Sequence, residues 1–312
     1  MRNAFVNALI ENATKDTILI TGDLGFGVLS EFHNKFPKQY LNAGVAEQNM
    51  TSVAAGLSIE GKKVFTYSIA NFNTLRALEQ IRNDVAYHNL NVAIVAVGGG
   101  LCYGQLGISH HATEDLAILR AIPNMTVFAP GDTKEAYIIT KLIIEQELGP
   151  VYLRIGRAGE ATIHSDDSIK NFKVGKFLPL IVEEKANIAI LSTGGMLETA
   201  KAVHDVLFHE NLTASVYSFH TIKPFDKEGV LEIFNKYSYI YSIEEHSIIG
   251  GFASAISESL IGIKNCNIGK FYAFALPSEF TSKVGDQNYL RNIYGLSVNN
   301  IVSKIKQFVE NE

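Results

Sequence analysis

The chain contains few of the residues and segments that are typical of secreted, membrane-bound or nucleic-acid-binding proteins. Its 312 residues include no tryptophan, seven prolines and two cysteines, Cys102 and Cys266, which stand alone without metal-ligand spacing. Two isolated thiols exclude a disulfide framework and fit a reducing compartment. No apolar run approaches the roughly 20 residues of a membrane-spanning helix. The first residues predict an amphipathic helix rather than a signal peptide, so the sequence predicts a soluble cytoplasmic protein.

The chain also lacks a large excess of positive or negative charge. Lys and Arg number 27 against 32 Asp and Glu, which gives a net charge of -5 and a pI of about 6.0. The absence of a dense basic run argues against a nucleic-acid partner and against an anionic membrane surface. With 47% apolar residues, a chain of this length can bury two ordinary cores, so two domains are expected.

Short β-branched runs alternate with segments of helical period along the chain. The expected strands of the first half are 17–21, 63–67, 92–97, 126–128 and 151–154, and the expected helices are 47–60, 75–88, 114–121 and 133–146. The pattern restarts with strands at 188–191, 214–219, 239–243 and 271–275 and helices at 196–210, 227–236, 252–261 and 298–310. This alternation predicts an α/β fold of two doubly wound domains with mostly parallel sheets. We expect the domains at 1–160 and 175–312, joined by a polar linker at 161–174.

Residues that could carry chemistry follow the predicted strands of the first domain, at the sheet edge where active residues gather. Asp23 follows the first strand, and Phe72 follows the strand at 63–67. Between them, the run Leu-Asn-Ala-Gly-Val-Ala-Glu-Gln-Asn-Met at 41–50 places Glu47 after a glycine turn, at the start of an apolar helix. A carboxylate there has a helix N-terminus and apolar side chains around it. On spacing alone, a helix-capping Glu47 and a tuned acid both remain open.

The adjacent His110 and His111 suggest a metal site, because Glu114 and Asp115 follow closely. Adjacent histidines rarely converge on one ion, however, and the spacing of catalytic zinc ligands is absent. We therefore expect no metal ligands in this chain.

Glycines and arginines at other predicted strand ends leave further alternatives. The triple glycine 98–100 lacks the Gly-x-Gly-x-x-Gly and Walker patterns, so we expect it to give backbone room beside a ligand rather than to cradle a phosphate. Arg154 and Arg157 could be anion contacts, or they could be surface arginines at a domain edge.

Several motifs, in order, resemble the pyrimidine-binding half of the transketolase family. They are Gly-Val-Ala-Glu-Gln-Asn-Met at 44–50, Phe72, Leu-Gly-Ile-Ser-His-His-Ala-Thr-Glu-Asp at 106–115 and Arg-Ala-Ile-Pro-Asn-Met at 120–125. The rest of the chain resembles the family's carboxy-terminal domain, and there we expect Lys223, Glu244, Glu245 and His246 to be structural. The resemblance implies the pyrimidine-binding fold of thiamine diphosphate enzymes, followed by a transketolase carboxy-terminal domain.

The resemblance also implies thiamine diphosphate as cofactor and assigns residues to it. The cofactor forms an ylid and stores a carbanion, and an acid must share a proton with its aminopyrimidine. Glu47 matches the family's acid, and Phe72 matches the aromatic residue that packs on the pyrimidine. Asp23 and Leu24 match the Asp-Leu pair beside the bent cofactor.

Substrate contacts follow from the same resemblance. His110 matches a histidine that faces the cofactor and the sugar, where it can move protons to and from sugar oxygens. His111 stands where the family usually has Gln. Arg157 matches an arginine that holds a sugar phosphate, and Arg2 matches an arginine near the start of the domain.

Three further positions depart from the family's pattern. Leu106 stands in place of an aspartate that contacts a donor hydroxyl. Glycine stands at position 98 and near position 27, where the family has a histidine and a serine for phosphate. These departures predict substrates other than the ordinary pentose phosphates.

The family's diphosphate-binding half, with Gly-Asp-Gly and an Asn-containing Mg²⁺ site, has no counterpart in these 312 residues. Since the cofactor lies between the two halves, the resemblance implies a separate N-terminal subunit that binds the diphosphate and most of the Mg²⁺, in a heterotetramer. The leading hypothesis is the carboxy-terminal subunit of a split transketolase, which moves a two-carbon ketol unit between sugars.

Two alternatives share the fold. A subunit similar to 1-deoxyxylulose-5-phosphate synthase or to the 2-oxoacid dehydrogenase beta chain would decarboxylate a 2-oxoacid donor. A non-catalytic stabilising or regulatory subunit would not need Glu47. A dinucleotide-binding dehydrogenase is disfavoured because no glycine fingerprint follows the first strand.

Overall fold

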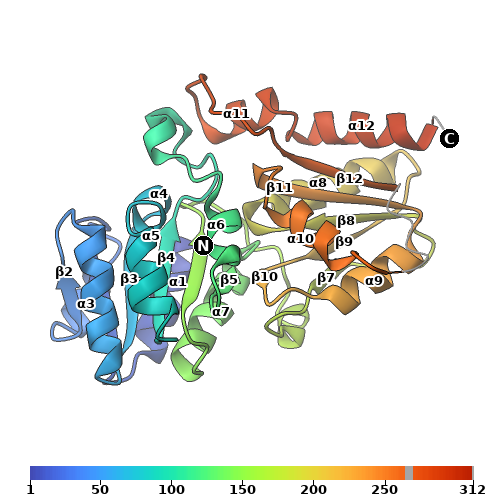
Figure 1. Ribbon diagram of the computed structural model, residues 1–312. Helices are drawn as coiled ribbons and strands as arrows, with labels where there is room; N and C mark the ends of the chain where they lie inside the picture. The colour runs from blue at the N-terminus through green and yellow to red at the C-terminus, as the bar shows by residue number, and fades with distance from the viewer. Residues whose placement is uncertain (264–269, 311–312) are drawn as a thin grey trace.

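Two α/β sheets lie side by side in the protein, whose structure is a computed structural model describing residues 1–263 and 270–310 (Figure 1). The strand order of the first sheet is β10-β5-β6-β4-β3-β1-β2, and that of the second is β12-β11-β8-β9-β7. The predicted α/β fold class with mostly parallel sheets is confirmed. Cys102 is a free thiol, and Cys266 lies outside the described residues.

The first sheet is parallel except at one edge. Its parallel strands are β1 (Thr17–Thr21), β2 (Tyr40–Asn42), β3 (Lys63–Ile69), β4 (Val92–Val97), β5 (Thr126–Phe128) and β6 (Val151–Ile155). The edge strand β10 (Thr221–Lys223) pairs antiparallel with β5 and comes from the range predicted for the second domain. The two predicted domain ranges therefore share this sheet, and the exact boundaries stay a prediction.

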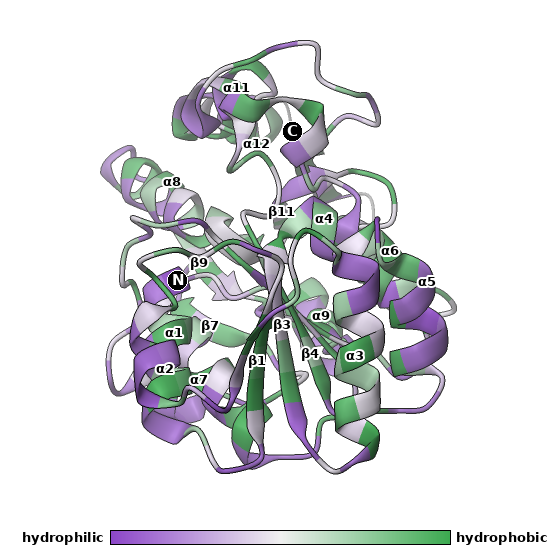
Figure 2. Cartoon of the chain, turned by 90° about the vertical axis from the view of Figure 1, so that its left-hand side faces the viewer, coloured by the Kyte–Doolittle hydropathy of each residue, from purple (hydrophilic) through white to green (hydrophobic). Residues whose placement is uncertain are grey.

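Helices cover both faces of the first sheet (Figure 2). On one face lie α1 (Arg2–Asn12), α2 (Ser30–Lys35) and α7 (Thr133–Glu145). On the other lie α3 (Glu47–Ile59), α4 (Ala70–Thr74), α5 (Leu78–Gln80), a π-helical turn (Ile81–Ala86) and α6 (Asp115–Ala121). Because both faces are covered, every residue of the central strand β4 is buried, as its unbroken apolar run predicts.

The helix predicted at 75–88 is wrong in its start and in its regularity. The chain turns helical at Ala70, and the later part is broken into α5 and the π-helical turn. The early start has a polar cause: the buried Asn73 amide donates to the Val95 carbonyl, 2.9 Å away, and the Thr74 hydroxyl donates to the Ala70 carbonyl. The spacing of apolar residues gives no indication of such buried hydrogen bonds.

The second sheet contains β7 (Leu178–Ile181), β8 (Ile188–Ser192), β9 (Ala214–Ser218), β11 (Tyr239–Ser247) and β12 (Phe271–Leu276). Around it lie α8 (Leu197–His209), α9 (Lys227–Lys236), α10 (Phe252–Ser259), α11 (Gln287–Ile293) and α12 (Val298–Glu310). The strand predicted at 239–243 continues to Ser247, because its polar end is buried and hydrogen-bonded. Among the described residues, no helix combines the length and the apolar character needed to cross a membrane.

Candidate active site

The carboxyl ends of β4, β3, β1 and β2 are neighbours along one edge of the first sheet. The residues that follow these ends are, respectively, the triple glycine 98–100, Phe72, Asp23 and Glu47. This edge is where an open parallel sheet places its ligands. The fold therefore brings the predicted site residues to one edge, although they are distant in sequence.

Glu47 is the first residue of α3, and its side chain is 1% exposed. Its two carboxylate oxygens have separate donors: the Ser68 hydroxyl lies 3.1 Å from Oε1, and Arg76 Nη1 lies 2.7 Å from Oε2. No side chain caps the start of α3. The helix-capping interpretation of Glu47 is therefore wrong, and the carboxylate instead points to the end of β3.

Gly22 keeps this carboxylate closely packed. A Cβ atom at Gly22 would lie 3.3 Å from Ser68 Oγ and 3.4 Å from Glu47 Oε1. The missing side chain thus leaves room for the hydrogen-bonded pair. Any larger residue would push Ser68 or Glu47 aside.

Phe72 lies half-buried in α4 and joins Glu47 to the histidine loop. The Arg76 guanidinium lies 4.7 Å from the centre of the Phe72 ring, and the His110 ring lies edge-on at 5.0 Å. The Asn71 amide donates to the Ser109 carbonyl at 2.7 Å, which ties α4 to the loop that carries His110. The structure therefore brings three of the predicted residues together: Glu47, Phe72 and His110.

Asp23 and Leu24 occupy the turn after β1. Asp23 has a left-handed backbone with φ of 56°. Its carboxylate accepts from the Asn42 amide at 2.9 Å, and its N–H donates to the Asn42 side-chain oxygen at 3.1 Å. This reciprocal pair ties the ends of β1 and β2, while Leu24 packs against the core under α1 and α2. Their predicted contact with a cofactor stays a prediction.

The two adjacent histidines lie in different surroundings. His110 is half-buried beside Phe72, and its Nδ1 lies 2.9 Å from the Ser109 hydroxyl. His111 is buried and lines a small cavity with Leu276 of the second sheet. Burial lowers the pKa of His111. His111 as a substrate contact stays a prediction.

Arg154 does not meet the expectation of an anion contact. Its side chain is buried, its Nε lies 2.7 Å from Asp115 Oδ2, and its Nη2 donates to the carbonyls of Ala112 and Glu245. The Tyr152 hydroxyl donates to the same Asp115 oxygen at 2.5 Å. The charges of Arg154 and Asp115 are therefore both paired inside the protein.

The triple glycine makes room for protein side chains. A Cβ atom would lie 2.1 Å from the Tyr103 ring at Gly98, 2.4 Å from Arg154 Nε at Gly99, and 2.3 Å from Glu245 Oε1 at Gly100. Atoms that are not bonded to each other cannot approach so closely. A place for these glycines beside a ligand stays a prediction.

Arg157 is exposed, and its guanidinium lies 5.4 Å from the centre of the Tyr103 ring. Burial raises the pKa of Tyr103, and the charges of Arg157 and Arg2 oppose that shift. Arg157, Tyr103 and Leu106 line a cavity of about 460 Å³ beside the histidine loop. Arg157 therefore lies at this cavity, beside Tyr103.

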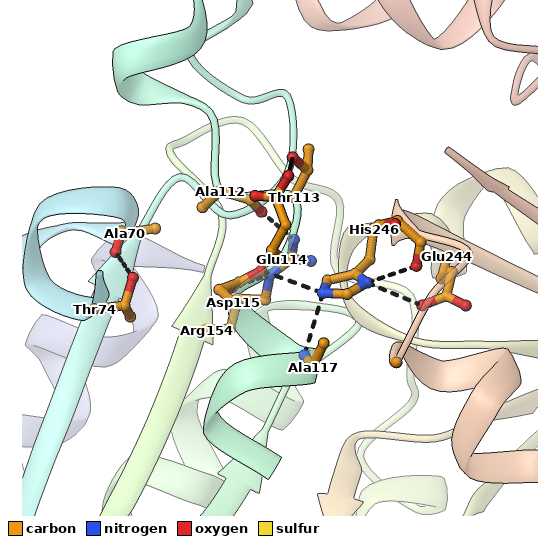
Figure 3. A network of polar contacts seen from close by, with 12 residues as sticks. Ala70, Thr74, Ala112, Thr113, Glu114, Asp115, Ala117, Arg154, Glu244 and His246 are labelled. Atoms are coloured by element: carbon orange, nitrogen blue, oxygen red, sulfur yellow. Dashed lines mark hydrogen bonds and ion pairs between the residues drawn. The ribbon is translucent and has the colours of Figure 1, made fainter. Parts of the chain in front are cut away.

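A polar network joins the two halves of the molecule (Figure 3). The Ala117 N–H donates to His246 Nε2, so the ring proton lies on Nδ1, which bonds the Ser247 carbonyl at 2.8 Å. Glu244 accepts from the Phe252 and Ala253 N–H groups at the start of α10. These contacts belong to structural residues, as expected for this part of the chain.

Lys223 and Glu245 make similar connections. The Lys223 ammonium donates to the Arg120 carbonyl at 3.1 Å and to the Ile122 carbonyl at the end of α6. Glu245 accepts from the Leu101 N–H at 2.6 Å and also pairs with Arg291 of α11. Both residues fasten the first half of the chain to the second.

Two residues of the site, Ser68 and Arg76, were not predicted from the sequence. Ser68 is an unremarkable residue near the end of β3, so no pattern marks it. Arg76 follows Phe72 by four positions, the spacing that would place two side chains on one face of a helix, although Arg76 itself lies just beyond the end of α4. Spacing could therefore have indicated the contact of Arg76 with Phe72, but not its pairing with Glu47.

Family models match most of the chain. Residues 1–159 match the transketolase pyrimidine-binding domain, and residues 179–301 match the transketolase C-terminal domain. The chain belongs to the transketolase family. Enzymes of this family depend on thiamine diphosphate.

Individual relatives extend over almost the whole chain. A transketolase C-terminal section of Methanocaldococcus jannaschii is 36% identical over 100% of this chain and 97% of its own length. A 6-deoxy-6-sulfo-D-fructose transketolase subunit of Clostridium sp. MSTE9 is 32% identical over 99% and 94%. A solved structure described as a split gene transketolase, inactive beta4 tetramer, superposes with a TM-score of 0.85 at 34% identity, covering 98% of this chain and 96% of the other.

Proposed function

We propose that this chain is one subunit of a thiamine diphosphate-dependent transketolase that transfers a two-carbon ketol unit between sugars. The observation that carries the proposal is the placement of Glu47. It is a buried carboxylate at the carboxyl edge of a parallel sheet, and Arg76 links it to Phe72, whose ring in turn contacts His110. In this family, the aminopyrimidine of the cofactor requires an acid and an aromatic surface in that arrangement.

The residues present fit the pyrimidine end of the cofactor. Thiamine diphosphate supplies, when bound, a nucleophilic carbon and an electron sink. Glu47 would hold a pyrimidine nitrogen and share a proton with it, while Ser68 fixes the carboxylate. Phe72 would pack on the ring, and Asp23 and Leu24 would flank the cofactor from the turn after β1.

His110 is proposed to move protons to and from sugar oxygens. It lies at the outer edge of Phe72, on the side of the cavity lined by Tyr103 and Arg157. Arg157 and Arg2 would attract the anionic end of a sugar. His111 is proposed as a further contact only if its buried cavity opens.

We propose that the diphosphate and Mg²⁺ are held mainly by a separate N-terminal subunit, in a heterotetramer. The names of relatives support this proposal, because they describe subunits of a transketolase and, in one case, an inactive tetramer of beta chains. The chain alone should then bind the cofactor poorly and catalyse nothing. Its cytoplasmic location stays a prediction.

The substrate is proposed to be a ketose with an anionic group. One relative carries the name of a sulfonated sugar, and Arg157 beside the cavity suits a sulfonate as well as a phosphate. Leu106 is 55% exposed at that cavity and offers no hydrogen bond to a donor hydroxyl. A sugar with fewer hydroxyl groups at that place would suit it better.

Ketol transfer by this chain co-expressed with a diphosphate-binding subunit tests the proposal. Donors would be phosphorylated, sulfonated and neutral ketoses, with pyruvate included for the 2-oxoacid alternative. Transfer only with both chains, reduced about 10²- to 10⁴-fold by Glu47→Ala, is expected. The control is Glu60→Ala at the exposed end of the same helix, which should leave activity unchanged.

Two results would overturn the proposal. Full activity with Glu47→Ala would remove the cofactor assignment and favour a regulatory subunit. Consumption of pyruvate with release of CO₂, in place of ketol transfer, would favour a subunit of the decarboxylating kind.

A further inference from the structure

Arg76 makes two contacts in the candidate site, one with Glu47 and one with Phe72. Its guanidinium lies 2.7 Å from Glu47 Oε2 and, at the same time, 4.7 Å from the centre of the Phe72 ring. One flat cationic group thus covers both the carboxylate and the aromatic residue. Its side chain is 45% exposed, whereas that of Glu47 is 1% exposed.

These two contacts are the ones that an aminopyrimidine would need. A guanidinium is planar, presents N–H donors along its edge and stacks on aromatic faces. An aminopyrimidine ring is also planar and would use its edge for Glu47 and its face for Phe72. The two groups therefore compete for the same surfaces.

We propose that Arg76 is a placeholder for the cofactor's aminopyrimidine. In the free chain its guanidinium occupies Glu47 and Phe72, and it leaves both when the cofactor binds. This inference rests on the proposed function, and it adds a displacement step to cofactor binding.

Burial explains why the free chain needs the placeholder. A buried carboxylate without a cationic partner is costly, and Ser68 alone supplies one neutral hydrogen bond. Arg76 supplies the missing charge from the solvent side. Once a pyrimidine nitrogen shares a proton with Glu47, that cation is no longer required.

Exposure explains why Arg76 can leave. Its long side chain reaches the site from the short connection between α4 and α5, and almost half of it faces water. Glu47, in contrast, is fixed by its burial and by Ser68. A half-exposed ion pair is weak, so displacement costs little but is not free.

Cofactor binding to variants of the two-chain complex tests the placeholder. Thiamine diphosphate with Mg²⁺ would be titrated calorimetrically into wild type, Arg76→Ala and Arg76→Met. Removal of the competitor is expected to tighten binding about threefold to tenfold, the fold-change that corresponds to losing a half-exposed ion pair. The control is Arg82→Ala, since the exposed Arg82 guanidinium donates to the neighbouring Asn83 side chain.

Thermal melting of the chain alone supplies a second measurement that needs no activity. Arg76→Ala should melt about 2 °C lower than wild type, because Glu47 loses its cation. Adding Glu47→Gln should restore that loss, since it removes the buried charge. Arg76→Lys should keep the melting temperature but bind cofactor with intermediate affinity, because it keeps the charge without the flat stacking group.

The possible outcomes separate this inference from the proposed function. If wild type binds the cofactor and Arg76→Ala binds equally or more weakly, Arg76 stays in the loaded site and the placeholder is refuted. An unchanged melting temperature in Arg76→Ala would refute it as well. If the wild-type complex binds no thiamine diphosphate, the proposed function itself fails.

Discussion

Two arginine–carboxylate pairs of the first sheet have the same length and differ in everything around them. The Arg76–Glu47 and Arg154–Asp115 pairs are both 2.7 Å long. The side chain of Arg76 is 45% exposed, whereas that of Arg154 is 7% exposed and also donates to two backbone carbonyls. A short distance alone therefore does not separate a displaceable arginine from a fixed one. The remaining partners and the access to water do.

The largest expected difference between the two pairs is in stability. Asp115→Ala would leave Arg154 buried without its carboxylate and Tyr152 without its acceptor. We expect the free energy of unfolding in urea to fall by about 3–5 kcal/mol. Arg76→Ala should lower it by only about 0.5–1 kcal/mol.

A matched control keeps this comparison interpretable. Combining Asp115→Ala with Arg154→Leu removes the buried charge, so part of the lost stability should return. Similar losses for Asp115→Ala and Arg76→Ala would show that the two pairs are energetically alike. The distinction drawn from exposure would then be wrong.

Most of the strands, and the place of Glu47 at the start of a helix, could be predicted from the sequence because their signals are local. Buried strands such as β4 read as unbroken apolar runs, and Glu47 opens a helix directly after a glycine turn. Family motifs then gave roles to Glu47, Phe72 and His110, and the fold places these three together. Their roles in chemistry stay predictions, which the experiments above test.

Contacts between distant segments could not be predicted. Ser68 and Arg76 reach Glu47 across 21 and 29 positions of sequence. Arg154 sits near a strand end like any anion-binding arginine, and only the packed structure shows its carboxylate partner. The edge strand β10 is three residues long and joins a sheet built from the other half of the chain, so its pairing leaves no periodic signal.

The pH dependence of stability should identify the network between the two halves. Burial raises the pKa of Glu244 to about 7, so the folded chain holds a proton there that the unfolded chain has lost above its ordinary value of 4.5. Glu244 therefore makes the free energy of unfolding fall as pH rises from about 4.5 to 7. Burial lowers the pKa of His246, so this histidine makes the free energy of unfolding fall as pH drops below 6.5.

Glu244→Gln should therefore reveal the contribution of His246 to the pH dependence of stability. Between pH 5 and 6.5 the two slopes oppose each other in wild type, and each proton is worth at most about 1.4 kcal/mol per pH unit. Urea unfolding across this range should show stability rising more steeply with pH in Glu244→Gln. Glu79→Gln, on the exposed surface of α5, is the control and should follow wild type. Parallel profiles for wild type and Glu244→Gln would contradict the assignment.

The smallest expected effect compares two leucines of the loop that follows β4. Leu101 is buried in the core formed by the second sheet and its helices. Leu106, in contrast, is 55% exposed at the cavity lined by Tyr103 and Arg157. Leu106→Asp should change stability by less than about 0.5 kcal/mol. It should raise kcat/KM about twofold to tenfold for donors with a hydroxyl at the contacted carbon, relative to donors without one, because one hydrogen bond is gained. Leu106→Asn is the uncharged control, and an equal change of kcat/KM for both kinds of donor would mean that Leu106 does not select the sugar.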